Sequence, residues 1–198
     1  MTHRIDMENR KIYRSVQEMR ADGKKIRGLA CATESWSKDL GGFREIIHRS
    51  ALTPELLATS DIMLNVDHDT SKVLARSKFG KGSLRCFITD RGLEFETTAP
   101  DTQLGRDMLV MLERGDYSQC SFCFSLPVDD EGFWHRNEAG ELVREISKFD
   151  RLYDVSIVYD PAYDATEADA RSRAVVSAFS HLDLLEKEIN SIKFYDEN

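Results

Sequence analysis

The sequence has no long apolar run, so it offers no helix that could span a membrane. Its first twenty residues are charged throughout and lack the apolar core of a secretory signal. Basic residues are too few to balance the acidic ones: 27 lysines and arginines against 35 aspartates and glutamates give a formal charge of −8. Nucleic-acid binding draws on a basic surface, so this balance argues against a nucleic-acid-binding protein.

Cysteines are also few, and their spacing is a poor match for a metal or redox site. Without a secretory signal we expect all four, Cys31, Cys86, Cys120 and Cys123, to be reduced thiols. Cys120 and Cys123 have CxxC spacing, but the chain contains no second CxxC and no HxxxH. In a strand these two side chains would point to opposite faces, whereas zinc and redox pairs need converging sulfurs. A zinc or redox protein is therefore a weak alternative, and we expect no cofactor.

The hydrophobic pattern predicts a strand-rich domain with interspersed helices. Strands are expected over residues 25–32, 62–66, 83–88, 93–97, 118–126 and 147–159. Helices are expected from Thr53 as N-cap and over 102–114, with Asp101 as N-cap and Gly115 as the stop. Residues 33–52 are interpreted as a loop. Because the strands connect mostly by hairpins, the pattern favours an α+β domain built on an antiparallel sheet or barrel.

The length of 198 residues suits one compact domain with an appendage at each end. We predict a mobile N-terminal arm over 1–23, a folded domain over 24–173 and a C-terminal amphipathic helix over 174–198. The apolar stripe of that helix consists of Val175, Phe179, Leu182, Leu185, Ile189 and Ile192. Such a stripe can pack on the domain or on a partner chain, and the residues do not choose between the two.

Three polar residues are candidates for nucleophilic catalysis. Ser121 lies in mid-strand on the polar face, opposite the apolar face of the 118–126 strand. His68 follows a buried-looking strand, between two aspartates that would favour the imidazolium. Asp154 lies inside an apolar strand, where a carboxylate is costly unless it is paired, and alternation puts it on one face with Leu152 and Ser156. Spacing alone leaves open a solvated serine, a structural histidine and an edge-strand aspartate.

Five segments in fixed order carry a more specific signal. They are LNVDHD at 64–69, DRGLEFE at 90–96, PDTQLGRDML at 100–109, RGDYSQCSFCF at 114–124 and LYDVSIVYDPAY at 152–163. Together they resemble the tailed-phage (caudovirus) prohead protease family, over about residues 24–173. The resemblance implies a serine endopeptidase with a fold similar to the herpesvirus assembly proteases, a mostly antiparallel β-barrel surrounded by helices.

The resemblance also implies roles for individual residues. It makes Ser121 the nucleophile, His68 the base and Asp154 the acidic partner, although the stretch from Asn65 to His68 is two residues longer than in the usual family segment. Many relatives have glycine where this chain has Cys123. By analogy with the herpesvirus enzymes, we expect the oxyanion donors in the loop at 160–162.

The implied function is capsid maturation inside the phage prohead, in the host cytoplasm. The resemblance implies that the enzyme cleaves the scaffold or an N-terminal segment of the major capsid protein and then itself, and that it self-associates through helices. The alternative is a non-catalytic capsid assembly or scaffolding module. The acidic charge and the apolar stripe in 174–198 support that alternative, which predicts no proteolysis.

Overall fold

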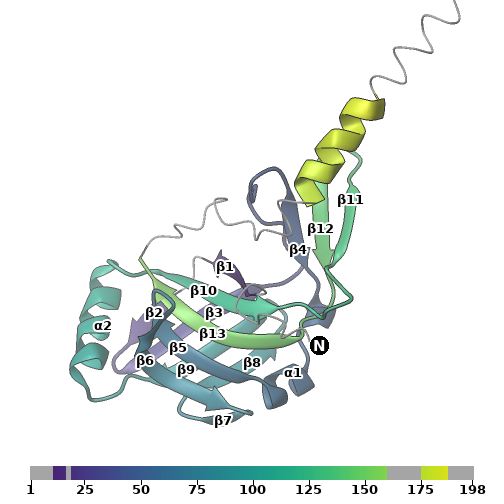
Figure 1. Cartoon of the computed structure of the whole chain (residues 1–198). Helices are drawn as coiled ribbons and strands as arrows, with labels where there is room; N and C mark the ends of the chain where they lie inside the picture. The colour runs from purple at the N-terminus through teal and green to yellow at the C-terminus, as the bar shows by residue number, and fades with distance from the viewer. Residues whose placement is uncertain (1–10, 17–18, 160–174, 187–198) are drawn as a thin grey trace, which may run out of the picture.

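A computed structural model gives the fold, and it describes residues 11–16, 19–159 and 175–186. Strands dominate this part of the chain, and short helices lie at its margins (Figure 1). The strands are β1 (Ile12–Val16), β2 (Met19–Asp22), β3 (Lys25–Ala32), β4 (Arg44–Ile47), β5 (Asp61–Val66), β6 (Asp69–Lys78), β7 (Lys81–Gly82), β8 (Arg85–Thr89), β9 (Gly92–Thr98), β10 (Gln119–Ser125), β11 (Phe133–Arg136), β12 (Leu142–Ile146) and β13 (Arg151–Val158). The helices are the 3-10 turn η2 (Arg49–Ala51), α1 (Pro54–Thr59), α2 (Gln103–Arg114) and the helical segment 175–186.

The strands form three sheets. The largest has the order β1-β10-β13-β5-β6-β7, the second β2-β3-β9-β8 and the third β11-β12-β4. Most neighbours are antiparallel, but β13 pairs with β5 and β12 with β4 in parallel. The main core contains side chains of the first two sheets, among them Phe122 and Val155 from one and Ile26 and Phe95 from the other. The third sheet projects from this body, beside the helical segment 175–186 (Figure 1).

The predicted helix-surrounded, herpesvirus-assemblin-like α+β barrel is wrong. Strands make up 47% of the fold, helices are short, and the three sheets formed by the described residues are open. Barrel closure requires the two edge strands of a sheet to pair with each other. The edges β1 and β7 of the largest sheet do not, and neither do β2 and β8 of the second. Alternation along a strand predicts which side chains face the core, but not whether the sheet closes.

Several local predictions are confirmed, with one correction to a helix cap. Thr53 accepts a hydrogen bond from the Leu56 N–H at the start of α1, and Gly115 ends α2 with a φ of 79°. The N-cap of α2 is Thr102, not Asp101, since the Thr102 side chain accepts from the Gly105 N–H. None of the helices in the described ranges is long and apolar enough to cross a membrane.

The segments outside the central domain show more structure than the sequence indicates. Strands β1 and β2 lie within the predicted arm at 1–23 and pair with β10 and β3. The predicted loop at 33–52 contains β4 and η2. At the other end, Val176 and Phe179 pack against a small second core formed by Leu40, Phe43 and Leu142. The three-part division of the chain stays a prediction.

Candidate active site

Strand β10 presents two different faces, as its alternation predicts. Cys120, Phe122 and Phe124 belong to the main core, whereas Ser121 points away from it. The outward residues Gln119, Ser121, Cys123 and Ser125 define what we call the site face of the largest sheet. Ser121 is fully buried, and it lies between Ser15 of β1 and Ser156 of β13 in the strand register. The two cysteines of the CxxC therefore point to opposite sides of the sheet.

His68 reaches the site face from the tight turn between β5 and β6. Val66 pairs with Asp69, so Asp67 and His68 form a two-residue hairpin loop, and both have positive φ values, 51° and 57°. That is the pattern of a type I′ turn, in which an L-residue such as histidine is strained. Ser156 holds the turn from the neighbouring strand: its Oγ accepts the His68 N–H at 2.7 Å and donates to the Asn65 carbonyl at 3.3 Å.

Strand β13 is irregular just beyond Asp154, which lies on the same face as Ser156 and Ser121. Cys123 pairs with Asp154 but the next residue, Phe124, pairs with Leu152, so Tyr153 is an extra residue in a β-bulge. Leu152 therefore points into the core while Asp154 lies on the site face. The expectation that Leu152 and Asp154 share a face is wrong for this reason. The hydroxyl of the bulged residue, Tyr153, donates a hydrogen bond to Ser125 Oγ at 3.2 Å.

These three side chains meet at hydrogen-bond distance. His68 Nδ1 lies 2.7 Å from Asp154 Oδ1, and His68 Nε2 lies 2.7 Å from Ser121 Oγ. An ionised carboxylate only accepts, so Nδ1–H donates to Asp154 and Nε2 is left to accept the Ser121 hydroxyl proton. The side chains of His68 and Asp154 are each 9% exposed, so the interactions act with little solvent screening. The arrangement can deprotonate a serine hydroxyl and hold the resulting imidazolium.

One further residue, Tyr13, packs against the imidazole. The Tyr13 ring meets the His68 ring edge to face, with 4.6 Å between centroids. Tyr13 and Asp154 are the register partners of Cys123 on its two sides, so the imidazole lies on the Cys123 side of Ser121. Burial, and to a smaller extent the charge of Asp154, raise the pKa of the Cys123 thiol to about 12. Cys123 is thus a neutral neighbour of the histidine.

Tyr117, which precedes β10, makes a further contact with the Asp67–His68 turn. The Tyr117 hydroxyl donates to Asp67 Oδ2 at 2.9 Å, next to His68. Burial, followed by the hydrogen bond to Asp67, raises the pKa of Tyr117 to about 12. Tyr117 also meets Tyr159 edge to face, with 6.0 Å between centroids. An aromatic pair therefore borders the site where β10 begins and β13 ends.

The structure brings together all three side chains singled out from the sequence, Ser121, His68 and Asp154. The loop at 160–162, expected to supply oxyanion donors, lies outside the described residues. Sequence reasoning missed the roles of Ser156 and Tyr13. Ser156 carried a weak signal as a small polar residue two positions from Asp154 in a buried strand, but Tyr13 carried none.

Comparison with known proteins gives the site its context. No match was found among curated proteins. Among solved structures, the bacteriophage T4 capsid assembly protease is similar, with a TM-score of 0.47 and 8% identity over 76% of this chain and 98% of that one. A family model described as caudovirus prohead serine protease matches residues 11–180. That range includes most of the chain, and the chain belongs to the caudovirus prohead serine protease family.

Proposed function

We propose that Ser121, His68 and Asp154 are the catalytic triad of a serine endopeptidase that matures the phage capsid. Membership of the family supports a protease of capsid maturation. The observation that carries the residue assignment is the position of the imidazole, with one ring nitrogen 2.7 Å from a hydroxyl and the other 2.7 Å from a carboxylate. This is the arrangement by which serine hydrolases on unrelated folds activate their nucleophile.

The chemistry follows from the proton positions. Ser121 Oγ attacks the carbonyl carbon of the scissile peptide bond while His68 Nε2 takes the hydroxyl proton. Asp154 accepts the Nδ1–H and stabilises the imidazolium that forms. His68 then returns the proton to the leaving amine, which leaves an acyl group on Ser121. Water, deprotonated by His68, releases that acyl group and restores the serine.

We further propose that the enzyme works inside the prohead, in the host cytoplasm, on the scaffold or the major capsid protein and then on itself. Membership of the prohead protease family supports this setting.

The test is a phage that carries Ser121→Ala, with Ser125→Ala as the matched control on the same strand and face. Both positions are buried serines of β10, but Ser125 bonds to Asp150 and Tyr153 instead of His68. We expect proheads with Ser121→Ala to assemble and to retain uncleaved scaffold, capsid protein and protease, as seen by mass spectrometry. Proheads with Ser125→Ala should process all three. Normal processing by the Ser121→Ala phage would end the assignment.

A further inference from the structure

The substrate side of the nucleophile is defined by the strand register. Two residues that contact the His68 ring, Asp154 and Tyr13, are the register partners of Cys123 on its two sides. The imidazole therefore occupies the Cys123 side of Ser121. The scissile carbonyl must reach Ser121 Oγ from a direction that the imidazole leaves open. On β10, that open direction leads away from Cys123. The next side chain of the site face there is Gln119, about 7 Å from Ser121 along the strand.

Gln119 has an unusual environment for an amide side chain. It is 9% exposed, and its Oε1 is buried with no hydrogen-bond partner among the residues that the structure describes. Its register partner Val158 is also buried, yet Val158 does not belong to the main core, in contrast to its neighbour Ile157. Gln119 and Val158 therefore continue the site face beyond Ser121. A buried acceptor without a donor is costly, so a position like this one calls for a ligand that brings an N–H group.

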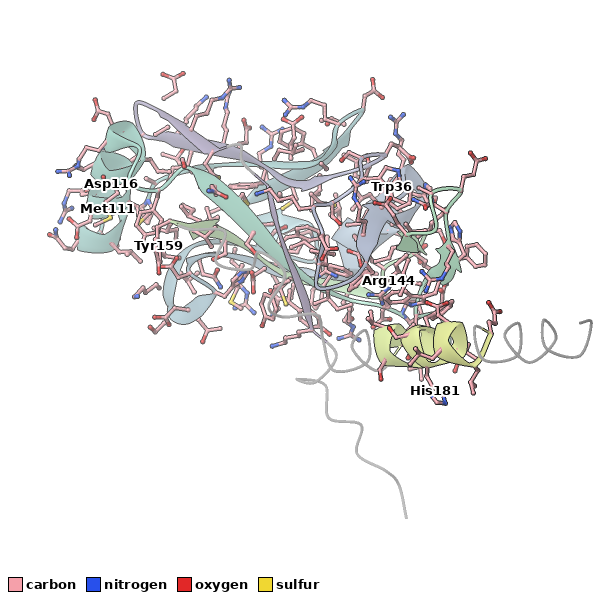
Figure 2. All side chains as sticks on the ribbon, turned by 90° about the horizontal axis from the view of Figure 1, so that it is seen from above. Trp36, Met111, Asp116, Arg144, Tyr159 and His181 are labelled. Carbon is pink, nitrogen blue, oxygen red and sulfur yellow. The ribbon has the colours of Figure 1, made fainter. Side chains whose placement is uncertain are left out.

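A second buried amide shows why Gln119 is the relevant one. Both polar atoms of the Asn65 side chain are buried and have no hydrogen-bond partner in the described part of the chain. Asn65 lies on β5, however, two strands away from Ser121 in the order β10-β13-β5. Gln119 is on the nucleophile strand itself and close to the aromatic pair Tyr117 and Tyr159. Tyr159 lies at the α2 end of the molecule, together with Met111 and Asp116 and far from Trp36 and Arg144 (Figure 2).

We propose that Gln119 is a substrate-binding residue whose Oε1 accepts a main-chain N–H of the peptide next to the scissile bond. This inference rests on the proposed function, because it needs Ser121 to be the nucleophile. Every peptide residue except proline has a main-chain N–H, so the contact aligns the substrate without reading its side chains. It gives β10 two functions on one face: Ser121 attacks the carbonyl, and Gln119 holds the backbone beside it.

The experiment compares two covalent probes on the full chain. In an alkyl fluorophosphonate without an amide, Ser121 Oγ attacks phosphorus and displaces fluoride. The second probe is a set of N-acylated aminoalkyl diphenyl phosphonates with alanine, leucine, phenylalanine or lysine side chains, in which the same attack displaces phenoxide. These phosphonates carry an N–H at the position of the main-chain N–H of a peptide substrate. The quantity measured is the ratio of the two second-order labelling rates, phosphonate over fluorophosphonate. The ratio cancels a general loss of folded or active protein.

Gln119→Leu should lower this ratio roughly five- to tenfold, the loss expected for one hydrogen bond to a buried acceptor. Gln119→Glu keeps an acceptor oxygen and should hold the ratio closer to the wild-type value. Gln103→Leu makes the same exchange at an exposed position on α2 and should leave it unchanged. An equal ratio in Gln119→Leu and wild type overturns the inference, as does a wild type that reacts with the fluorophosphonate but with no phosphonate. A wild type that the fluorophosphonate fails to label refutes the proposed function instead, and the inference falls with it.

Discussion

Ser156→Ala separates positioning of the base from general stability. Ser156 is fully buried, and its Oγ accepts the His68 N–H at 2.7 Å while it donates to the Asn65 carbonyl at 3.3 Å. Alanine removes only that oxygen and leaves a backbone donor of the strained turn without its partner. We expect a loss of about 1–3 kcal/mol in the free energy of unfolding, the usual cost of an unsatisfied buried polar group.

The effect on the chemistry should be larger than the effect on folding. Without Ser156 Oγ, the His68 N–H loses its acceptor on β13, while the Asp67 N–H keeps its bond to the Ile157 carbonyl at 3.0 Å. The turn can then shift at His68, so the imidazole loses its fixed distance to Ser121. A shift of this kind by about 1 Å can cost roughly a hundredfold in rate. We therefore expect the labelling of Ser121 by an alkyl fluorophosphonate to slow by roughly ten- to a hundredfold.

The control for this prediction is Ser125→Ala. Ser125 is equally buried, but its Oγ contacts lie at 3.3 Å from Asp150 Oδ2 and 3.2 Å from the Tyr153 hydroxyl, away from His68. Its removal should lower stability in urea unfolding and leave the labelling rate near that of the wild type. The reasoning fails if Ser156→Ala unfolds earlier yet labels at the wild-type rate, or if both variants label equally slowly.

Two other substitutions test the charges. Asp154→Asn keeps the size of the side chain but no longer fixes the His68 tautomer. The rate of fluorophosphonate labelling should therefore fall on the order of 10³- to 10⁴-fold, with little change in urea unfolding. A fall of less than tenfold would exclude Asp154 as the orienting group. On the third sheet, Glu145 accepts hydrogen bonds at 2.8 Å from both His48 and His135, which raises the pKa of each histidine and lowers that of Glu145. A raised histidine pKa stabilises the fold below the ordinary value of 6.5 and ceases to do so as pH rises through the raised pKa, whereas the lowered Glu145 pKa stabilises above 4.5. Glu145→Gln should therefore lower both histidine pKa values in an NMR titration. The loss in the free energy of unfolding, relative to the wild type, should be greatest between pH 4.5 and 6.5. A loss that grows above pH 8 would contradict this.

The sequence was a good guide wherever a local pattern settles the outcome. Alternation along β10 correctly separates Ser121 from the core residues Phe122 and Phe124. The cap signals at Thr53 and Gly115 mark helix ends as expected, because each acts on backbone groups within four residues. The choice of Ser121, His68 and Asp154 needed the family resemblance as well, since each has an ordinary interpretation by itself.

Features that depend on pairing with distant strands could not be predicted. Strand β4 is short, follows a glycine pair and pairs in parallel with β12, about a hundred residues away along the chain. Its Glu45 is 3% exposed and binds Arg14 of β1 at 2.8 Å and Arg144 of β12 at 3.3 Å. In the sequence these residues look like solvated charges. Only the fold reveals that they join three strands in a buried ionic cluster.

The geometry of the site depends on one strained turn and on the register of two neighbouring strands. The positive φ at His68 turns the imidazole back over the sheet. Ser121 pairs with Ser156 and Cys123 with Asp154, so regular alternation from Ser156 puts Asp154 on the same face as Ser121. The bulge at Tyr153 begins just beyond Asp154 and turns Leu152 into the core, which keeps an apolar side chain off the site face. The strained turn is costly unless neighbouring groups hold it, and here Ser156 supplies that contact. The residue types thus account for the kind of chemistry, while the turn and the register account for its assembly at one place.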